Sequence, residues 1–120
     1  MSNLHKACEQ NNIISVTRIL NTNPNLNLNE FSNNKLCELM YCINENKNIE
    51  IIKLLLKKGA NVNLIYQEYT PLIVACYRNN EEIVKLLLDC GADVDLQNIN
   101  TNTALMFYIE KKYKYKHKYY

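Results

Sequence analysis

Residues that could carry catalysis or hold a metal are few in this chain and do not cluster along it. The chain contains two histidines, His5 and His117, and five cysteines. No two histidines have ligand spacing, and no Cys-x-x-Cys pair is present. With two glycines in all, a glycine-rich phosphate loop is also absent. We therefore expect no catalytic residue, no metal site and no cofactor.

The cysteines are more easily explained as packing residues than as reactive ones. They are Cys8, Cys37, Cys42, Cys76 and Cys90. An odd number of cysteines without paired spacing argues against a disulfide framework, so all five are expected to be free thiols. Cys8 and Cys76 each follow an alanine and are expected to be small buried hydrophobes. Cys90 precedes Gly91 and is expected to be exposed.

The carboxylates Glu81 and Glu82 are adjacent and could in principle act as an acid and a base. They lie at the start of an apolar helical run, where the helix dipole favours negative charge. A solvated helix start is therefore the favoured interpretation, and nothing else in the sequence suggests an enzyme.

The elements that would position these residues are revealed by an internal repeat. The run Ile51–Leu64 is nearly restated as Ile83–Leu96, and Gly59 and Gly91 are likewise 32 residues apart. A fixed period of this size indicates a stack of small units, each of which buries its apolar face on the next. Such stacks commonly present an extended surface to a partner.

Capping signals place helices within each unit. Thr70 is a good N-cap residue, and Pro71 fits the first helical position, where its missing N–H costs little. Gly59 and Gly91 each follow a helical run, at the point where a left-handed C-cap favours a residue without Cβ. The apolar stripe of the later run is formed by Ile83, Val84, Leu87 and Leu88.

The first unit is matched to the third by a shift of 68 residues, which places Leu4 opposite Leu72. A shift of 32 places Met40 opposite Leu72 and Ile43 opposite Ala75. The first interval is therefore 36 residues, and the extra residues are assigned to the segment between Leu28 and Met40.

Leu36, Leu39, Met40 and Ile43 fall on one helical face. This pattern predicts a helix that begins before Glu38, near Asn33 or Asn34, and absorbs the insertion. The alternative is a longer connecting segment at 29–31.

Several signals recur together: Leu4-His5-x-Ala7-Cys8, Thr70-Pro71-Leu72-x-x-Ala75, and two Gly-Ala-Asn/Asp-Val-Asn/Asp turns. On these residues the chain resembles the ankyrin-repeat family. The resemblance implies an all-α solenoid of helix–turn–helix units joined by short hairpin-like fingers. It also implies that His5 makes a structural hydrogen bond between units. The domain is expected to span 1–110, with repeats at about 2–33, 34–66, 67–99 and a partial one at 100–110, followed by a basic Lys/Tyr tail at 111–120.

The resemblance further implies a protein-binding module, because ankyrin-type proteins bind partners through finger tips and the concave side of each first helix. Carried over by position, the third unit offers Tyr66, Gln67, Tyr69, Tyr77 and Arg78. The second unit offers Glu45 and Asn46, and the fourth offers Asn100, Asn102, Glu110 and Lys111. Tyr66, Tyr69, Tyr77 and Arg78 are the central candidates, because tyrosine and arginine are the residue types that anchor interfaces.

Other functions stay open at this stage. The segment 110–120 contains five lysines and one glutamate, so it could bind nucleic acid or an anionic surface. A frayed solubilising terminus is favoured, so nucleic acid is not the expected partner. The chain could also be a structural fragment of a larger array. We expect a monomer that binds another protein.

The expected compartment is intracellular. No apolar run approaches the ~20 residues that a membrane-spanning helix needs, and no secretory segment is visible at the N-terminus. We expect the cytoplasm, or the host cytoplasm if the chain comes from a virus or is a bacterial effector.

Overall fold

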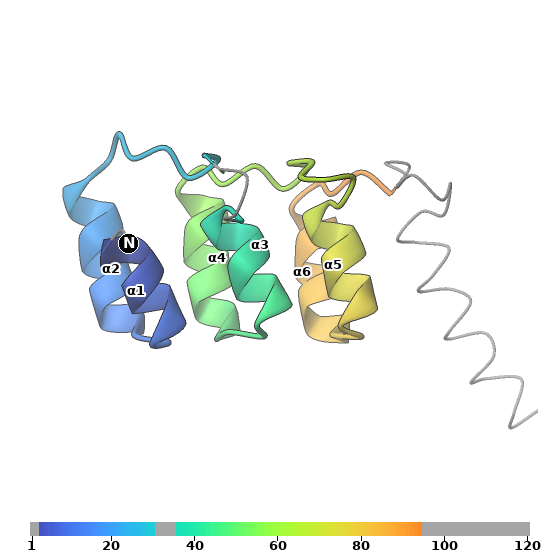
Figure 1. The fold of residues 1–120 in the computed structure, drawn as a ribbon, viewed down its shortest axis with the longest axis horizontal. Helices are drawn as coiled ribbons and strands as arrows, with labels where there is room; N and C mark the ends of the chain where they lie inside the picture. Colours follow the sequence, from blue (N-terminus) through green and yellow to red (C-terminus); the bar gives the residue numbers. More distant parts are fainter. Residues whose placement is uncertain (1–2, 31–35, 95–120) are drawn as a thin grey trace, which may run out of the picture.

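The computed structural model describes residues 3–30 and 36–94, which form three helix pairs. The pairs are α1 (Asn3–Glu9) with α2 (Ile13–Thr22), α3 (Glu38–Asn44) with α4 (Ile49–Lys57), and α5 (Pro71–Tyr77) with α6 (Glu81–Asp89). The first helices of the pairs stand in one row and the second helices in another, and the connecting segments run along one edge (Figure 1). The predicted all-α solenoid is confirmed.

Side-chain caps start most of these helices. Thr70 accepts a hydrogen bond from the Ile73 amide at 3.1 Å, and Pro71 occupies the first turn of α5, as predicted. Asn12, Asn48 and Asn80 begin the second helix of each pair in the same way, and each accepts a backbone N–H. These side chains satisfy N–H groups that have no partner within the helix.

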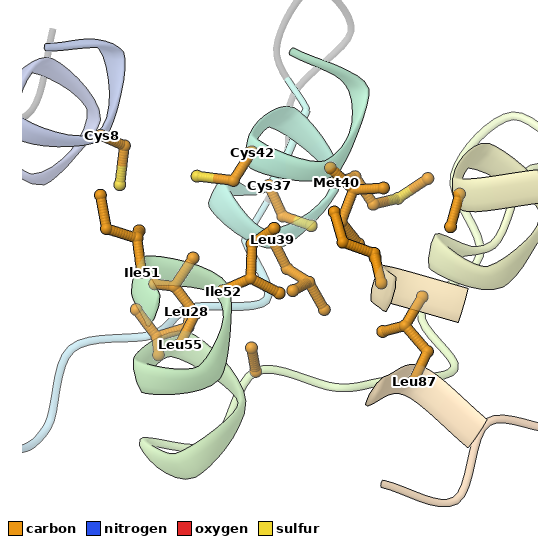
Figure 2. Close-up of a cluster of buried hydrophobic side chains, with 14 of the residues drawn as sticks. Cys8, Leu28, Cys37, Leu39, Met40, Cys42, Ile51, Ile52, Leu55 and Leu87 are labelled. Atoms are coloured by element: carbon orange, nitrogen blue, oxygen red, sulfur yellow. The ribbon is translucent and has the colours of Figure 1, made fainter. Parts of the chain in front are cut away.

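One apolar core runs through the stack, from Leu4 in α1 to Leu87 in α6. At its centre, Ile51, Ile52 and Leu55 of α4 have no exposed surface. They lie close to Leu28, which comes from the segment after α2 (Figure 2). Each helix pair thus completes its core only with side chains from its neighbours.

The predicted stripe on α6 is correct for three of its four residues. Ile83, Val84 and Leu87 are buried, whereas Leu88 is 37% exposed. Leu88 lies at the edge of the stripe, where the helix turns its side chain towards solvent.

The predicted register of the second unit is wrong by one residue. In each pair the turn between helices is closed by a backbone hydrogen bond, from Asn12 to Ala7, from Lys47 to Cys42, and from Asn80 to Ala75. Cys42 is therefore equivalent to Ala75, and Leu39, in place of Met40, is equivalent to Leu72.

The reason is that the insertion is divided between two places. The N-caps of α2 and α3 are 25 positions apart (12 to 37), whereas the N-caps of α4 and α5 are 22 positions apart (48 to 70). Three extra residues therefore lie between α2 and α3. The fourth extra residue is Lys47, in the turn between α3 and α4. The N-caps of α3 and α4 are 11 positions apart (37 to 48), whereas the N-caps of α5 and α6 are 10 positions apart (70 to 80). The Lys47 ammonium donates to the Glu9 carbonyl at 2.8 Å, so the added residue contacts the preceding unit.

The prediction that a helix begins near Asn33 or Asn34 is also wrong. Helix α3 begins at Glu38, and Cys37 is its N-cap with an extended backbone (ψ 159°). Leu36 lies outside the helix, yet it packs against the core. Its apolar character therefore reflects packing of a residue outside the helix, which happens to stand at helical spacing from Leu39.

Polar contacts also join neighbouring units. His5 Nδ1 lies 3.1 Å from a carboxylate oxygen of Glu38, and both residues are buried. The His5 ring packs on Tyr41 with ring centroids 4.5 Å apart. These contacts connect α1 to α3, so the expected structural hydrogen bond of His5 between units is confirmed.

A second series of contacts holds the fingers to one another. Asn29 accepts from the Asn61 amide at 2.6 Å and donates to the Gly59 carbonyl at 3.2 Å. One unit further on, Asn63 accepts from the Asp93 amide at 2.8 Å and donates to the Gly91 carbonyl at 3.4 Å. The finger bases are therefore aligned by repeating side-chain hydrogen bonds.

The predicted burial of Cys8 and Cys76 and the predicted exposure of Cys90 are confirmed. All five are free, four are buried and Cys90 is exposed. The sulfur atoms of Cys8 and Cys42 point towards each other between α1 and α3 (Figure 2). A hydrogen bond with the Cys8 thiol, together with burial, raises the pKa of the Cys42 thiol. Burial likewise raises the pKa of Cys37, so these two thiols are poor nucleophiles.

Replacing either glycine with valine is expected to destabilise the protein. Gly59 and Gly91 have φ angles of +108° and +90°, and a Cβ at either position would meet nothing within 4 Å. The cost is therefore backbone strain alone, about 1–3 kcal/mol for each substitution. Thermal and denaturant unfolding of Gly59→Val and Gly91→Val measures it. Asparagine at the same positions should cost less, and a melting temperature equal to wild type for the valine variants would contradict the assignment.

Cys90 is expected to be the first cysteine to be alkylated under native conditions, because the other four thiols are buried. Iodoacetamide labelling over time, followed by peptide mapping, gives the order of reaction. If Cys8 or Cys76 were labelled faster than Cys90, the helix register would be wrong.

Candidate functional site

The chemistry-bearing side chains of the described residues serve mainly to join the units. His5 and Glu38 contact each other, and Glu81 and Glu82 stand in the first turn of α6. Within 3–30 and 36–94, no group of three or more His, Cys, Asp or Glu side chains is placed to hold a metal ion.

A groove lies between the finger that precedes α5 and the helices α3 and α5. Its volume is about 580 Å³. Five of the residues predicted for partner binding line it, and they are Tyr66, Gln67, Tyr69, Tyr77 and Arg78. The other lining residues are Leu36, Met40, Asn44 and Val74. We call this hollow the finger groove.

The finger is closed by a two-residue turn. Tyr66 and Tyr69 exchange both backbone hydrogen bonds at 2.9 Å and form an antiparallel bridge. The side chains of residues that oppose each other in this way lie on the same face of the hairpin. The turn residues Gln67 and Glu68 have φ angles of 47° and 71°, the left-handed conformation that a tight hairpin turn requires.

The tyrosines present large and partly solvated surfaces. Tyr69 is 42% exposed and Tyr77 is 45% exposed, while Tyr66 is half-buried against the core. The rings of Tyr69 and Tyr77 are tilted at 58° with centroids 6.0 Å apart, a favourable aromatic arrangement. This contact joins the finger to the far end of α5.

Arg78, the C-cap of α5, is held in place by Asn44 at the end of α3. Its Nε and Nη2 groups donate to the Asn44 side-chain oxygen at 3.1 and 2.8 Å. The guanidinium therefore has a fixed position between two units, which reduces the entropy that a ligand contact would cost.

Two further predicted site residues within the described ranges, Glu45 and Asn46, do not line the finger groove. Glu45 is the C-cap of α3 and does not line it. Asn46 has a left-handed backbone (φ 54°), and its side chain accepts from the Asn80 amide group at 2.8 Å. It therefore serves the turn between helices. Asn100, Asn102, Glu110 and Lys111 lie outside the described residues.

Four groove residues were missed by the sequence reasoning. Leu36 and Met40 were interpreted as one face of a longer helix, so neither was considered for binding. Val74 is half-buried. In the sequence it lies between the predicted cap residues and the predicted surface residues of the third unit. Asn44 stands at the end of a short helix, and only the contact with Arg78 identifies it.

A second hollow of about 480 Å³ lies on the side of α4 and α6. Lys53, Leu56 and Lys57 of α4 line it together with Leu86 and Cys90. It carries none of the residues that were predicted to bind a partner.

No helix within 3–30 or 36–94 has the length and apolar character needed to cross a bilayer.

Comparison with known proteins agrees with the repeat architecture. A family model described as ankyrin repeats, three copies, matches residues 39–116, which is more than half of the chain. A relative named as an ankyrin repeat protein, L677 of Acanthamoeba polyphaga mimivirus, is 35% identical over 71 residues. That match covers 57% of this chain and 58% of the relative, so the chain spans less than two thirds of the relative's length. With three helix pairs, hairpin-like fingers and a matching family model, the chain belongs to the ankyrin-repeat family.

Proposed function

We propose that this chain is a non-catalytic protein-binding module and that the finger groove is its principal contact surface. Ankyrin repeats are generally protein–protein interaction modules, which supplies the general class. The observation that carries the specific proposal is the gathering of three tyrosines and one arginine around a single groove.

The residue types in the groove support this assignment. Tyrosine and arginine are enriched among the residues that dominate binding energy at interfaces. Tyrosine offers a large contact area with few rotatable bonds and a hydroxyl that can donate or accept a hydrogen bond. Tyr69 and Tyr77 are both exposed in spite of their size, so a partner could bury much of their surface.

The rigidity of the groove gives further support. The finger carries two successive non-glycine residues, Gln67 and Glu68, with positive φ. Such residues are strained by about 1–3 kcal/mol each, and they cluster at binding and active sites. Here the strain is held by the paired hydrogen bonds of Tyr66 and Tyr69, which keep both rings on one side of the finger.

An intracellular location is part of the same proposal. All five cysteines are free, including the facing pair Cys8 and Cys42. Thiols persist in this state in the reducing conditions of the cytoplasm, whereas secreted proteins commonly use cysteines in disulfides.

Replacing Tyr66, Tyr69 and Tyr77 together with alanine is expected to abolish partner binding. A pull-down from the native cell, read by quantitative mass spectrometry, compares the triple variant with wild type. Partners that bind through the finger groove should be lost by more than about tenfold, because each anchoring aromatic side chain commonly contributes 2 kcal/mol or more.

The matched control is Ile14→Ala on α2, because Ile14 is 77% exposed and lies outside the finger groove. This variant removes apolar surface elsewhere and should retain the partners. Thermal melts of both variants test whether the fold is retained. A folded triple variant that retrieves the same proteins as wild type would exclude the finger groove as the contact surface.

A further inference from the structure

We propose that the finger groove takes a peptide segment of a partner protein that presents one apolar side chain and, a few residues along from it, one carboxylate. This inference rests on the proposed function and deepens it, because it specifies the chemistry of the partner. It is carried by the apolar floor of the groove, by the placement of Arg78 and by the charges that surround the groove.

The floor of the groove requires an apolar occupant. Met40 is almost fully buried beneath it and Val74 is half-buried. The rings of Tyr69 and Tyr77 stand beside them. A polar side chain placed here would lose its water without gaining enough hydrogen-bond partners, whereas an aliphatic or aromatic side chain would be stabilised by burial.

The charge of the groove requires an anion beside that apolar side chain. Among the nine described residues that line the groove, Arg78 alone carries a charge. A guanidinium has five N–H donors, and two of the Arg78 donors are used by Asn44. The other three have no partner among the described residues, so they can form the forked pair of hydrogen bonds that arginine makes with a carboxylate.

The backbone positions that carry the two subsites lie close together on the helix. Val74 and Arg78 are four residues apart at the end of α5, and they are joined by a backbone hydrogen bond of 3.0 Å. At 1.5 Å per residue this is about 6 Å along the helix axis. The same separation is spanned by residues i and i+2 of an extended peptide, at about 6.7 Å, or by i and i+4 of a helix.

The surroundings favour a single carboxylate over a run of negative charge. Glu45 directly follows the lining residue Asn44, and Glu68 directly follows Gln67. Both glutamates are exposed, and neither lines the groove. They would repel negative charges beyond the one that reaches Arg78, which also disfavours a polyanion such as nucleic acid.

Short fluorescein-labelled peptides can test the proposal with the full chain. Each nine-residue peptide carries leucine or phenylalanine as the apolar residue in a Gly/Ser background, with glutamate two or four positions further on. Control peptides carry glutamine in place of the glutamate. Fluorescence anisotropy measures Kd, and the glutamate peptide of one spacing is expected to bind about tenfold or more tighter than its glutamine control.

Two protein variants locate the effect. Arg78→Gln is expected to remove the preference for glutamate, so that the glutamate and glutamine peptides bind this variant equally. Arg18→Gln is the matched control, since Arg18 is the only other arginine and is exposed on α2. It should keep the preference in full. Thermal melts of both variants test folding. A third variant, Arg78→Lys, is expected to show an intermediate preference for the glutamate peptide, because lysine keeps the charge but lacks the forked pair of donors.

The outcomes separate this inference from the proposed function. If the peptides bind in a tyrosine-dependent way without preference for glutamate, the inference is overturned and the proposed function stands. A preference that survives Arg78→Gln also overturns it. If no peptide binds at up to about millimolar concentration, the range of the weakest useful affinities, the inference is overturned, and the pull-down with the triple tyrosine variant decides the proposed function separately. An unlabelled oligonucleotide that displaces the peptides more strongly than the best glutamate peptide would identify the site as a nucleic-acid site and overturn the proposal.

Discussion

Burial of one helix pair against the next is the interaction on which the rest of this structure depends. Its six described helices are each seven to ten residues long, and isolated helices of this length are not stable in water. The side chains of Ile51, Ile52 and Leu55 show no exposed surface because α3 of their own unit and α2 of the preceding unit pack against α4. Stacking therefore stabilises the helices, and it also fixes the first helices in one row beside the fingers. The finger groove exists because α3, α5 and a finger converge at such a junction.

The polar contacts between units then determine how precisely the groove is shaped. Asn29 and Asn63 hold the bases of successive fingers, while the contact between Asn44 and Arg78 joins the C-terminal ends of α3 and α5. Gln67 of the finger tip lines the same groove as Asn44 and Arg78. Because Tyr66 and Tyr69 are paired through the backbone, the strained turn cannot relax without breaking that pair. Local strain and long-range order thus support each other in the groove.

Much of this arrangement could be predicted from the sequence, because the signals are local. Thr70, Gly59 and Gly91 act within one turn of a helix, so their residue types are sufficient to identify their roles. The start of α3 could not be predicted in this way. Leu36 stands at helical spacing from Leu39, but it packs against the core from outside the helix, and a period of 3.6 cannot distinguish these cases. The single added residue Lys47 likewise changes the register without leaving a signal.

Once the register is corrected, equivalent positions in the three units can be compared. Leu4, Leu39 and Leu72 are equivalent and identical, because all three lie in the core. The position of Arg78 is occupied by Gln10 and Glu45 in the earlier units, so it is neutral, negative and positive in turn. Core positions repeat because every junction has the same packing to satisfy, whereas groove positions are free to differ. Binding chemistry in a stack of this kind therefore resides in the positions that depart from the repeat. The positive charge at Arg78 beside the tyrosines makes the junction between the second and third units chemically distinct from the junction before it.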